Sequence, residues 1–445
     1  MSVRPKMIAA LSTLAIAALS ACNTVTPPAA QGGRADSLEY DYALNVDITP
    51  TDTTASLEAK YGGKVVLLEP AMGYAVMGFD GAQVEAQALS GNLKFERNKG
   101  AFLGGGQMAR MNGSVSAWAG GSVSAWAGGS VSAWAGGSVS AWAGGNYTYI
   151  PQNTLTWKQI RLEQGQRFAT NLGNGIRVAI IDTGIDLKHP AFTGAILETE
   201  MWDFVGNDAI PQEEGTLGFG AYGHGTNVAG IVLQIAPRAK ILPLRVLGAD
   251  GSGDVTRVAA AINYAVSKGV QVINLSLGSE NESSAVKSAI NDATAKGVFV
   301  VSSSGNTGDQ NVTFPASVAY EDKSAGPYSL SVGSVNSLDL KSVFSTYGTE
   351  KKPLEIVAPG ETVYAPAPDN RMAAWSGTSM AAPMNSGALA LALGQTLKVT
   401  RAELLEKMRV TAADIYNNSM NQAYKDMLGK GRLNIEQFLV DTISR

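Results

Sequence analysis

The spacing of hydrophobic and polar positions changes sharply near residue 157 of this 445-residue chain. Beyond that point, short runs rich in Val and Ile alternate with longer stretches whose apolar residues recur every three or four positions. The first pattern predicts buried strands and the second predicts helices. Strands are predicted at residues 177–181, 241–246, 270–275 and 298–301, and helices at residues 255–267 and 284–296. This alternation predicts an α/β fold, with a doubly wound, mostly parallel sheet covered by helices on both faces.

A smaller unit is predicted before this region. Residues 36–110 contain two predicted strands, at 65–68 and 74–79, and a predicted helix at 83–89. A segment of this size is sufficient for an independent α+β domain.

Residues 111–145 contain the octad Gly-Ser-Val-Ser-Ala-Trp-Ala-Gly four times. A period of eight does not fit the heptad of a coiled coil. Because eight is even, one tryptophan from each octad would lie on the same face of a sheet if each octad were a strand. The other interpretation is a Gly/Ser-rich linker lengthened by duplication. Both interpretations fit the sequence.

The chain begins with a segment that is typical of an export signal. Its apolar run, residues 7–19, follows two basic residues and is too short to span a bilayer comfortably. Residues 1–22 end in Leu-Ser-Ala-Cys, which resembles the lipobox of bacterial lipoproteins. In such proteins the cysteine, here Cys22, carries the lipid. We therefore expect an exported protein that is anchored in the membrane or released by processing, with residues 23–35 as a tether.

Composition excludes several other classes of protein. The net charge of −4 argues against a nucleic-acid partner. One cysteine rules out an intrachain disulfide, and one cysteine with two histidines is too few for the common zinc sites.

Two polar residues follow predicted strands directly or closely. Asp182 comes immediately after the strand at 177–181, and Asn306 follows the strand at 298–301. Active sites of open α/β sheets lie at these carboxyl ends. Either residue alone also fits a simple turn.

Two further residues carry nucleophilic and acid–base chemistry. His224 lies between two glycines, whereas the other histidine, His189, precedes a proline and is interpreted as structural. Ser379 precedes an Ala/Leu/Gly-rich predicted helix, so its N–H lies at a helix N-terminus, which favours an oxyanion. We expect Pro383 to lie in the first turn of that helix, where N–H groups have no partners.

The order Asp182, His224, Asn306, Ser379 along one parallel α/β region resembles the subtilase family of serine proteases, over residues 157–439. The resemblance implies a peptidase domain at 156–441, a catalytic triad of Asp182, His224 and Ser379, and Asn306 as the oxyanion donor. It also implies that extended substrate adds as a strand between two segments of the chain. The implied substrate-binding residues are Gly251, Ser252, Gly253, Ser276, Leu277, Gly278, Ser303, Ser304 and Gly305.

The same resemblance implies that residues 36–110 are a propeptide, which assists folding and then inhibits the enzyme in cis. Cleavage is expected between Gly144 and Thr156, after the repeat. The implied function is that of a secreted, self-processing endopeptidase acting on proteins or peptides. The alternative is a surface lipoprotein whose tryptophan repeat binds a partner, with proteolysis serving mainly its own maturation.

No cofactor is required by this resemblance. Many subtilases carry a calcium-binding loop in the helix after the catalytic histidine, but here the predicted helix continues without interruption. An acidic insertion with Asp208, Glu213 and Glu214 is either a cation site or a solvated loop. Calcium binding is therefore compatible with the sequence, which identifies no site for it.

Overall fold

The computed structural model describes residues 40–70, 73–88, 93–98, 102–104, 150–216, 220–321, 328–352 and 354–444. The predicted signal with Cys22 and the octad repeat lie outside the described residues. Within these ranges no helix is both long enough and apolar enough to cross a membrane.

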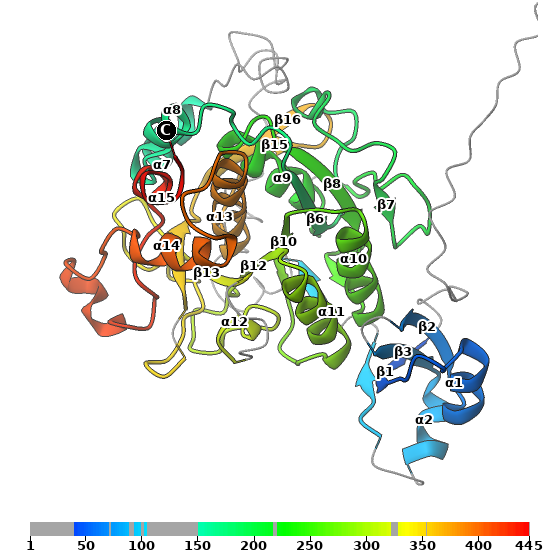
Figure 1. Ribbon diagram of the computed structural model, residues 1–445. Helices are drawn as coiled ribbons and strands as arrows, with labels where there is room; N and C mark the ends of the chain where they lie inside the picture. The colour runs from blue at the N-terminus through cyan, green and yellow to red at the C-terminus, as the bar shows by residue number, and fades with distance from the viewer. Residues whose placement is uncertain are drawn as a thin grey trace, which may run out of the picture.

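The larger unit is built on a seven-stranded, wholly parallel sheet with the order β14-β13-β12-β10-β6-β8-β7 (Figure 1). Its strands are β6 (Arg177–Asp182), β7 (Trp202–Asp203), β8 (Lys240–Arg245), β10 (Val272–Leu275), β12 (Phe299–Ser303), β13 (Ser329–Val335) and β14 (Ile356–Pro359). The chain runs from β6 to β8 on one side and then crosses to β10 on the other, which is the order of a doubly wound sheet. The predicted parallel α/β fold is confirmed.

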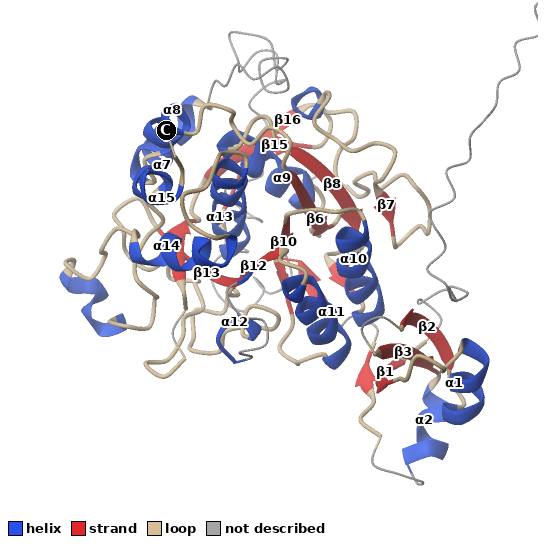
Figure 2. Ribbon diagram, viewed as in Figure 1, coloured by secondary structure: helices blue, strands red, loops and turns tan. Residues whose placement is uncertain are grey.

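Helices cover both faces of this sheet (Figure 2). The helices α9 (His224–Ile235) and α13 (Thr378–Leu393) pack on one face, and α10 (Val255–Ser267) and α11 (Ser284–Ala295) pack on the other. Val178 and Ile180 of β6 belong to the first core, whereas Ala179 and Ile181 belong to the second. Because side chains alternate along a strand, Asp182 is directed to the same face as Ile180, where α9 and α13 lie.

The domain has further elements besides β9 (Ser252–Gly253) and β11 (Leu277–Gly278), and several of them contribute buried side chains to the core on the face of α9 and α13. They are η4 (Pro151–Asn153), α7 (Thr154–Gln159), α8 (Leu162–Phe168), η5 (Pro190–Phe192), α12 (Val318–Glu321), β15 (Val363–Ala367), β16 (Arg371–Trp375), η7 (Arg401–Glu403), α14 (Leu404–Val410), η8 (Ser419–Tyr424) and α15 (Ile435–Thr442).

The smaller unit is a four-stranded antiparallel sheet with the order β2-β3-β1-β4. Its elements are β1 (Tyr42–Asp47), α1 (Thr54–Tyr61), β2 (Lys64–Glu69), β3 (Tyr74–Phe79), α2 (Gly81–Ala88) and β4 (Glu96–Arg97). Both predicted strands are confirmed, and the predicted helix begins two residues earlier than expected, at Gly81. One face of the sheet packs its own core, in which Leu57, Met77 and Phe79 are buried.

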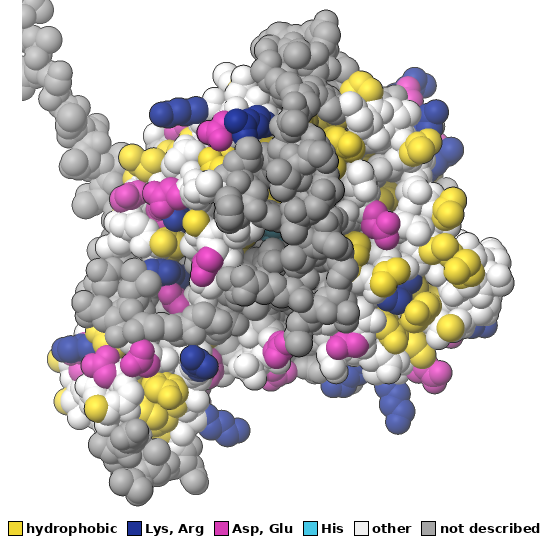
Figure 3. Space-filling model, turned by 180° about the vertical axis from the view of Figure 1, so that it is seen from behind, with side chains coloured by type: hydrophobic (Ala, Val, Ile, Leu, Met, Phe, Trp, Pro, Cys, Tyr) yellow, Lys and Arg dark blue, Asp and Glu magenta, His cyan; other side chains and the backbone are white. Residues whose placement is uncertain are grey.

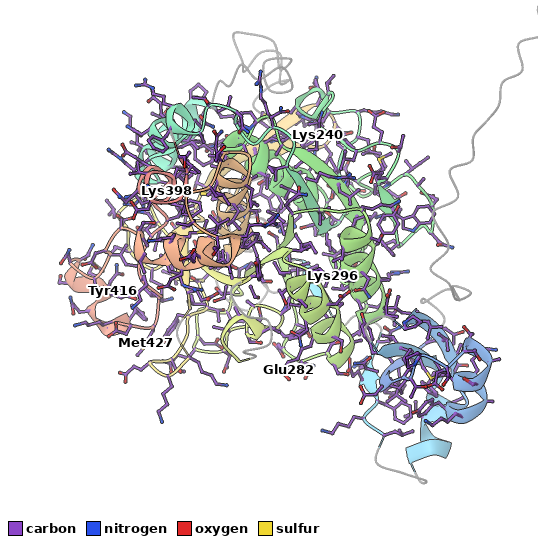
Figure 4. The ribbon with its side chains drawn as sticks, viewed as in Figure 1. Lys240, Glu282, Lys296, Lys398, Tyr416 and Met427 are labelled. Atoms are coloured by element: carbon purple, nitrogen blue, oxygen red, sulfur yellow. The ribbon has the colours of Figure 1, made fainter. Side chains whose placement is uncertain are left out.

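The other face of the small sheet packs on α10 and α11 of the larger unit (Figure 1). Leu67 and Val76 join the core of these helices, and Asn263 Nδ2 of α10 donates a hydrogen bond to Tyr74 Oη at 2.6 Å. Asn45 Nδ2 of β1 also donates to Ser288 Oγ of α11 at 3.0 Å. Within the larger unit, Lys296 directly follows α11 (Figure 4), and its ammonium group pairs with Asp292 at 2.8 Å. The two units therefore share buried surface as well as specific polar contacts.

Acidic and basic side chains are interspersed over the described part of the face drawn in Figure 3. This distribution agrees with a net charge of only −4 on the whole chain.

Candidate active site

The carboxyl ends of three neighbouring strands bring the predicted site residues to one edge of the sheet. Asp182 is the last residue of β6, and Ser276 directly follows β10. The parallel register pairs Ile180 with Asn274, so that Ser276 lies level with Asp182 on the adjacent strand. The next strand, β12, ends at Ser303. Neighbouring strands lie about 4.8 Å apart, so these ends form one compact edge.

Asp182 and His224 form a buried pair, each with a side chain only 1% exposed. His224 Nδ1 donates to Asp182 Oδ1 at 2.7 Å, and the Thr183 N–H donates to the same oxygen at 2.7 Å. Burial lowers the pKa of His224, but the charge and hydrogen bond of Asp182, together with the charge of Glu213, outweigh it and raise the pKa. In the part of the chain that the structure describes, His224 Nε2 is buried without a hydrogen-bond partner.

The glycines on either side of His224 are required by the backbone. Gly223 directly precedes α9 and has a φ of +96°, a left-handed conformation that favours glycine. A Cβ atom on Gly225 would lie 2.1 Å from the carbonyl oxygen of Gly184, so any side chain there would push α9 away from the end of β6. Trp375 packs its ring edge-on against the imidazole of His224, with centroids 5.7 Å apart.

Ser379 is held by two hydrogen bonds to Ser276. Its Oγ donates to the Ser276 carbonyl oxygen at 3.3 Å, and Ser276 Oγ donates to the Ser379 carbonyl oxygen at 2.8 Å. The predicted position of Pro383 in the first turn is wrong, because it is the sixth residue of α13. An N–H at that position would donate to the Ser379 carbonyl, four residues earlier. The hydroxyl of Ser276 takes the place of the donor that proline lacks.

The hydroxyl of Ser379 is thus directed at Ser276 rather than at His224. Rotation about the Cα–Cβ bond moves this oxygen between staggered positions without displacing α13. Hydrogen bonds between a nucleophile and its base are often long or misaligned until substrate binds.

Asn306 is anchored through one end of its amide. Its Oδ1 accepts from the Thr378 N–H at 2.9 Å and from Thr378 Oγ1 at 3.0 Å. The donor end, Nδ2, is consequently on the side of the amide away from Thr378. Gly305, with a φ of +111°, makes the turn that brings Asn306 to the N-terminus of α13.

The segment before Asn306 is buried and partly committed to structural hydrogen bonds. Ser304 Oγ donates to the Thr346 carbonyl at 2.9 Å, and the Gly305 N–H donates to Thr378 Oγ1 at 3.2 Å. Ser303 is 4% exposed. These three residues lie at the predicted edge, although the hydroxyl of Ser304 is already used within the protein.

The two segments expected to bind substrate lie on either side of a third strand. β9 (Ser252–Gly253) and β11 (Leu277–Gly278) both pair antiparallel with β5 (Phe102–Gly104), in the order β11-β5-β9. Gly251 precedes β9 with a φ of +82° and turns the chain into it. An extended backbone is therefore accommodated between these segments.

Glu213 was expected in a solvated loop or a cation site, and that expectation is wrong for this residue. It is 3% exposed and accepts four hydrogen bonds from residues around Asp182 and His224. Oε1 accepts from Thr183 Oγ1 at 2.5 Å and from the Gly223 N–H at 2.8 Å. Oε2 accepts from the Thr226 N–H at 3.0 Å and from its Oγ1 at 2.6 Å. Burial raises the pKa of Glu213 to about 7, against the hydrogen bonds, which lower it.

The other acidic residues of this insertion are exposed. Asp208 Oδ1 accepts from the Ile210 N–H at 2.7 Å. Glu214 pairs with Arg245 at 2.8 Å, and Arg245 also pairs with the buried Asp203 at 2.9 Å. Among the residues that the structure describes, no group of three or more His, Cys, Asp or Glu side chains is placed to hold a metal ion. Glu213 and Glu214 are therefore engaged by protein groups, whereas Asp208 lies in an exposed turn.

His189 has a structural role, as expected. Its Nδ1 accepts from the Ala191 N–H at 3.1 Å, which caps η5, and its Nε2 lies 3.0 Å from the Arg371 carbonyl oxygen. Burial lowers the pKa of this imidazole.

Comparison with known proteins identifies the family to which the chain belongs. A sequence model described as the subtilase family matches residues 173–431, more than half of the chain. The chain belongs to the subtilase family of serine endopeptidases. This subtilase is 38% identical to thermitase of Thermoactinomyces vulgaris over 233 residues, which are 50% of this chain and 76% of thermitase.

Two further proteins show the extent of the similarity. This subtilase is 33% identical to subtilisin NAT of Bacillus subtilis subsp. natto over 276 residues, 59% of this chain and 65% of that protein. The crystal structure of a cold adapted subtilisin-like serine proteinase aligns with a TM-score of 0.49 and 30% identity, over 59% of this chain and 89% of that one.

Proposed function

We propose that this subtilase is a secreted, self-processing endopeptidase with Asp182, His224 and Ser379 as its catalytic triad. The observation that carries the proposal is the 2.7 Å hydrogen bond between two buried side chains, His224 and Asp182, with the second ring nitrogen left without a described partner. An imidazole held in this way presents a free nitrogen as a general base. Ser379 lies at the same sheet edge, bonded to Ser276.

In the proposed reaction, His224 Nε2 takes the proton of Ser379 as Oγ attacks the scissile carbonyl carbon. Asp182 orients the imidazole and stabilises its protonated form. The developing oxyanion accepts from Asn306 Nδ2 and from the backbone N–H of Ser379 at the N-terminus of α13. His224 then gives the proton to the leaving amine, and water hydrolyses the acyl-enzyme by the reverse proton path.

Residues 251–253 and 276–278, with Ser303, Ser304 and Gly305, form the proposed binding site for protein or peptide substrates. Support comes from β9 and β11, which both present strand edges to an extended backbone. Glu213 is proposed as a positioning residue, because it ties the loop after Asp182 to the first turn of α9. No metal is assigned to this reaction.

The N-terminal parts of the chain are proposed to control and deliver the enzyme. Residues 36–110 act as a propeptide that inhibits in cis, supported by the packing of the small sheet on α10 and α11. Residues 1–22 direct export, and lipidation of Cys22 anchors the protein to a membrane through the tether at 23–35.

The substitution Ser379→Ala tests the triad. We expect loss of casein hydrolysis, loss of labelling by a fluorophosphonate and accumulation of uncut precursor. Ser267→Ala, which alters an exposed hydroxyl on α10, is the control and should behave as the wild type. A Ser379→Ala protein that still hydrolyses casein and processes itself at the wild-type rate would overturn the proposal.

A further inference from the structure

The space between two of the proposed substrate-binding segments contains a side chain that the sequence did not single out. Thr313 is 5% exposed, and its side chain packs against both Gly278 and Gly305. A Cβ atom on Gly278 would lie 2.7 Å from Thr313 Oγ1, and a Cβ atom on Gly305 would lie 2.8 Å from Thr313 Cγ2. The threonine therefore fills the space onto which both glycines open.

Hydrogen bonds hold Thr313 to both segments. Its N–H and its Oγ1 both donate to the Ser304 carbonyl oxygen, at 3.0 and 3.1 Å. The next residue, Phe314, exchanges two backbone hydrogen bonds with Ser279, at 2.7 and 3.0 Å. Because the hydroxyl of Thr313 is bonded to one of the segments, rotation about its Cα–Cβ bond is restrained and its methyl group is held in place.

The two segments flank the position at which the scissile carbonyl is proposed to react. One segment begins at Ser276, which exchanges hydrogen bonds with Ser379 at 3.3 and 2.8 Å. The other is followed directly by Asn306, the proposed oxyanion donor. The substrate residue that carries the reacting carbonyl must therefore lie beside both segments. Its side chain then enters the space between them, and Thr313 is at the far end of that space.

Thr313 also borders a cavity of about 530 Å³. The described residues that line this cavity include Asp309, Phe314 and Thr349, but none of the residues 276–278 or 303–305. The side chain of Thr313 thus separates the cavity from the space between the two glycines. Without that side chain, the two spaces would join.

We propose that Thr313 sets the specificity of this subtilase, which cleaves after small residues such as alanine and serine. This inference rests on the proposed function above. A small side chain before the scissile bond fits beside the threonine, whereas a leucine or phenylalanine side chain meets its methyl and hydroxyl groups. The larger side chain is excluded in the transition state as well as in the bound complex, so its substrates have a lower kcat/KM.

Peptide p-nitroanilides that differ only in the residue before the scissile bond measure this specificity. For the wild-type enzyme, we expect kcat/KM with alanine at that position to exceed kcat/KM with phenylalanine by roughly ten-fold or more. The substitution Thr313→Gly should lower this ratio by roughly ten-fold or more, because it opens the site into the cavity. A wild-type enzyme that cleaves the phenylalanine peptide as well as the alanine peptide overturns the inference, as does a Thr313→Gly enzyme with the wild-type ratio.

Two further variants separate the volume of Thr313 from its hydroxyl and from the cavity. Thr313→Val keeps nearly the same volume and removes the hydroxyl, so its ratio should stay within about three-fold of the wild-type ratio. Thr349→Ala, at another residue that lines the cavity, is the matched control and should keep the wild-type ratio. If Thr313→Val lost the preference for alanine as completely as Thr313→Gly, exclusion by volume would be wrong. Labelling by a fluorophosphonate verifies that each variant has folded.

The same peptides distinguish failure of this inference from failure of the proposed function. Ser379→Ala should cleave none of them, and cleavage by that variant at the wild-type rate contradicts the triad itself. An inactive Ser379→Ala protein, together with a wild-type enzyme that prefers phenylalanine to alanine, overturns only the role of Thr313.

Discussion

Glu213 accepts a 2.5 Å hydrogen bond from the hydroxyl of Thr183, the residue directly after Asp182. Through its second carboxyl oxygen it also binds Thr226, two residues after His224. One buried carboxyl group thus braces both members of the Asp182–His224 pair from outside the pair. We therefore expect a substitution of Glu213 to change the kinetics of the enzyme.

The substitution Glu213→Gln should reduce kcat roughly ten-fold, because an amide nitrogen cannot accept from the donors that now meet one carboxyl oxygen. Loss of its negative charge should also lower the pKa of His224 and move the acidic limb of the kcat/KM profile to lower pH. Steady-state kinetics across pH measures both effects. Glu214→Gln, at the exposed neighbour, is the control; an unchanged kcat and acidic limb in Glu213→Gln would refute the positioning role.

Folding stability should decrease with pH because of Glu213. Its pKa rises from 4.5 to about 7 on burial, so the folded state favours the protonated acid. The stabilising contribution is complete below pH 4.5 and is lost as pH rises through about 7, a loss of roughly 3 kcal/mol per group of this kind. Urea unfolding of the Ser379→Ala protein, which avoids self-digestion, should show that the free energy of unfolding decreases as pH rises from 4.5 to about 7. In a Ser379→Ala, Glu213→Gln double variant the free energy of unfolding should change less with pH. An equal change would exclude Glu213 as the source of the pH dependence.

The pH dependence of the wild-type enzyme should reflect the raised pKa of His224. A general base must be neutral, so kcat/KM should increase with pH along a limb whose midpoint lies above 6.5, the ordinary value for this side chain. Hydrolysis of a chromogenic peptide between pH 5 and 9 gives the midpoint. A midpoint below 6.5 would mean that burial, and not Asp182 and Glu213, controls this imidazole.

Asn306→Ala should lower kcat by roughly 100- to 1,000-fold and leave KM nearly unchanged, because the lost donor acts on the transition state. Thr378→Val should give a smaller decrease, since it removes the hydroxyl donor that helps to anchor Asn306 and keeps the backbone donor. Kinetics on one peptide substrate compares the two. If Asn306→Ala raised KM alone, the residue would be a substrate-binding group and not an oxyanion donor.

Ser276→Ala should destabilise the protein by about 1–3 kcal/mol, because the buried Ser379 carbonyl loses its donor. Pro383→Ala in the same protein restores an N–H four residues after that carbonyl and should recover part of the loss. Thermal unfolding of the two single variants and the double variant, all on a Ser379→Ala background, measures the coupling. Strictly additive effects would show that Ser276 does not substitute for the missing donor.

The strands, helices and candidate site residues of the larger unit could be predicted from the sequence because they depend on local patterns of residues. The Val/Ile runs predicted β6, β8, β10 and β12 within one or two residues at each end. Periodicity placed α10 at its observed bounds. Asp182, His224, Asn306 and Ser379 each follow a strand or begin a helix, and such positions converge at one edge of a parallel sheet. Their order along the chain carried the resemblance to the subtilases, which implied their roles.

Other features depended on packing between distant segments. The sequence around Glu213 predicts a solvated loop, and only the tertiary structure brings Thr183 and Thr226 into contact with its carboxyl group. The sequence predicted Pro383 in the first turn, where no donor is needed; in the fold it lies deeper in α13, and Ser276, more than a hundred positions earlier in the chain, supplies the missing donor. The pairing of β5 with β9 and β11 uses backbone groups, which residues of nearly every type carry, so no pattern of side chains in the sequence predicts it. Sequence therefore determined the fold class and the chemical groups, whereas tertiary contacts decided how those groups are braced and which part of the chain enters the cleft.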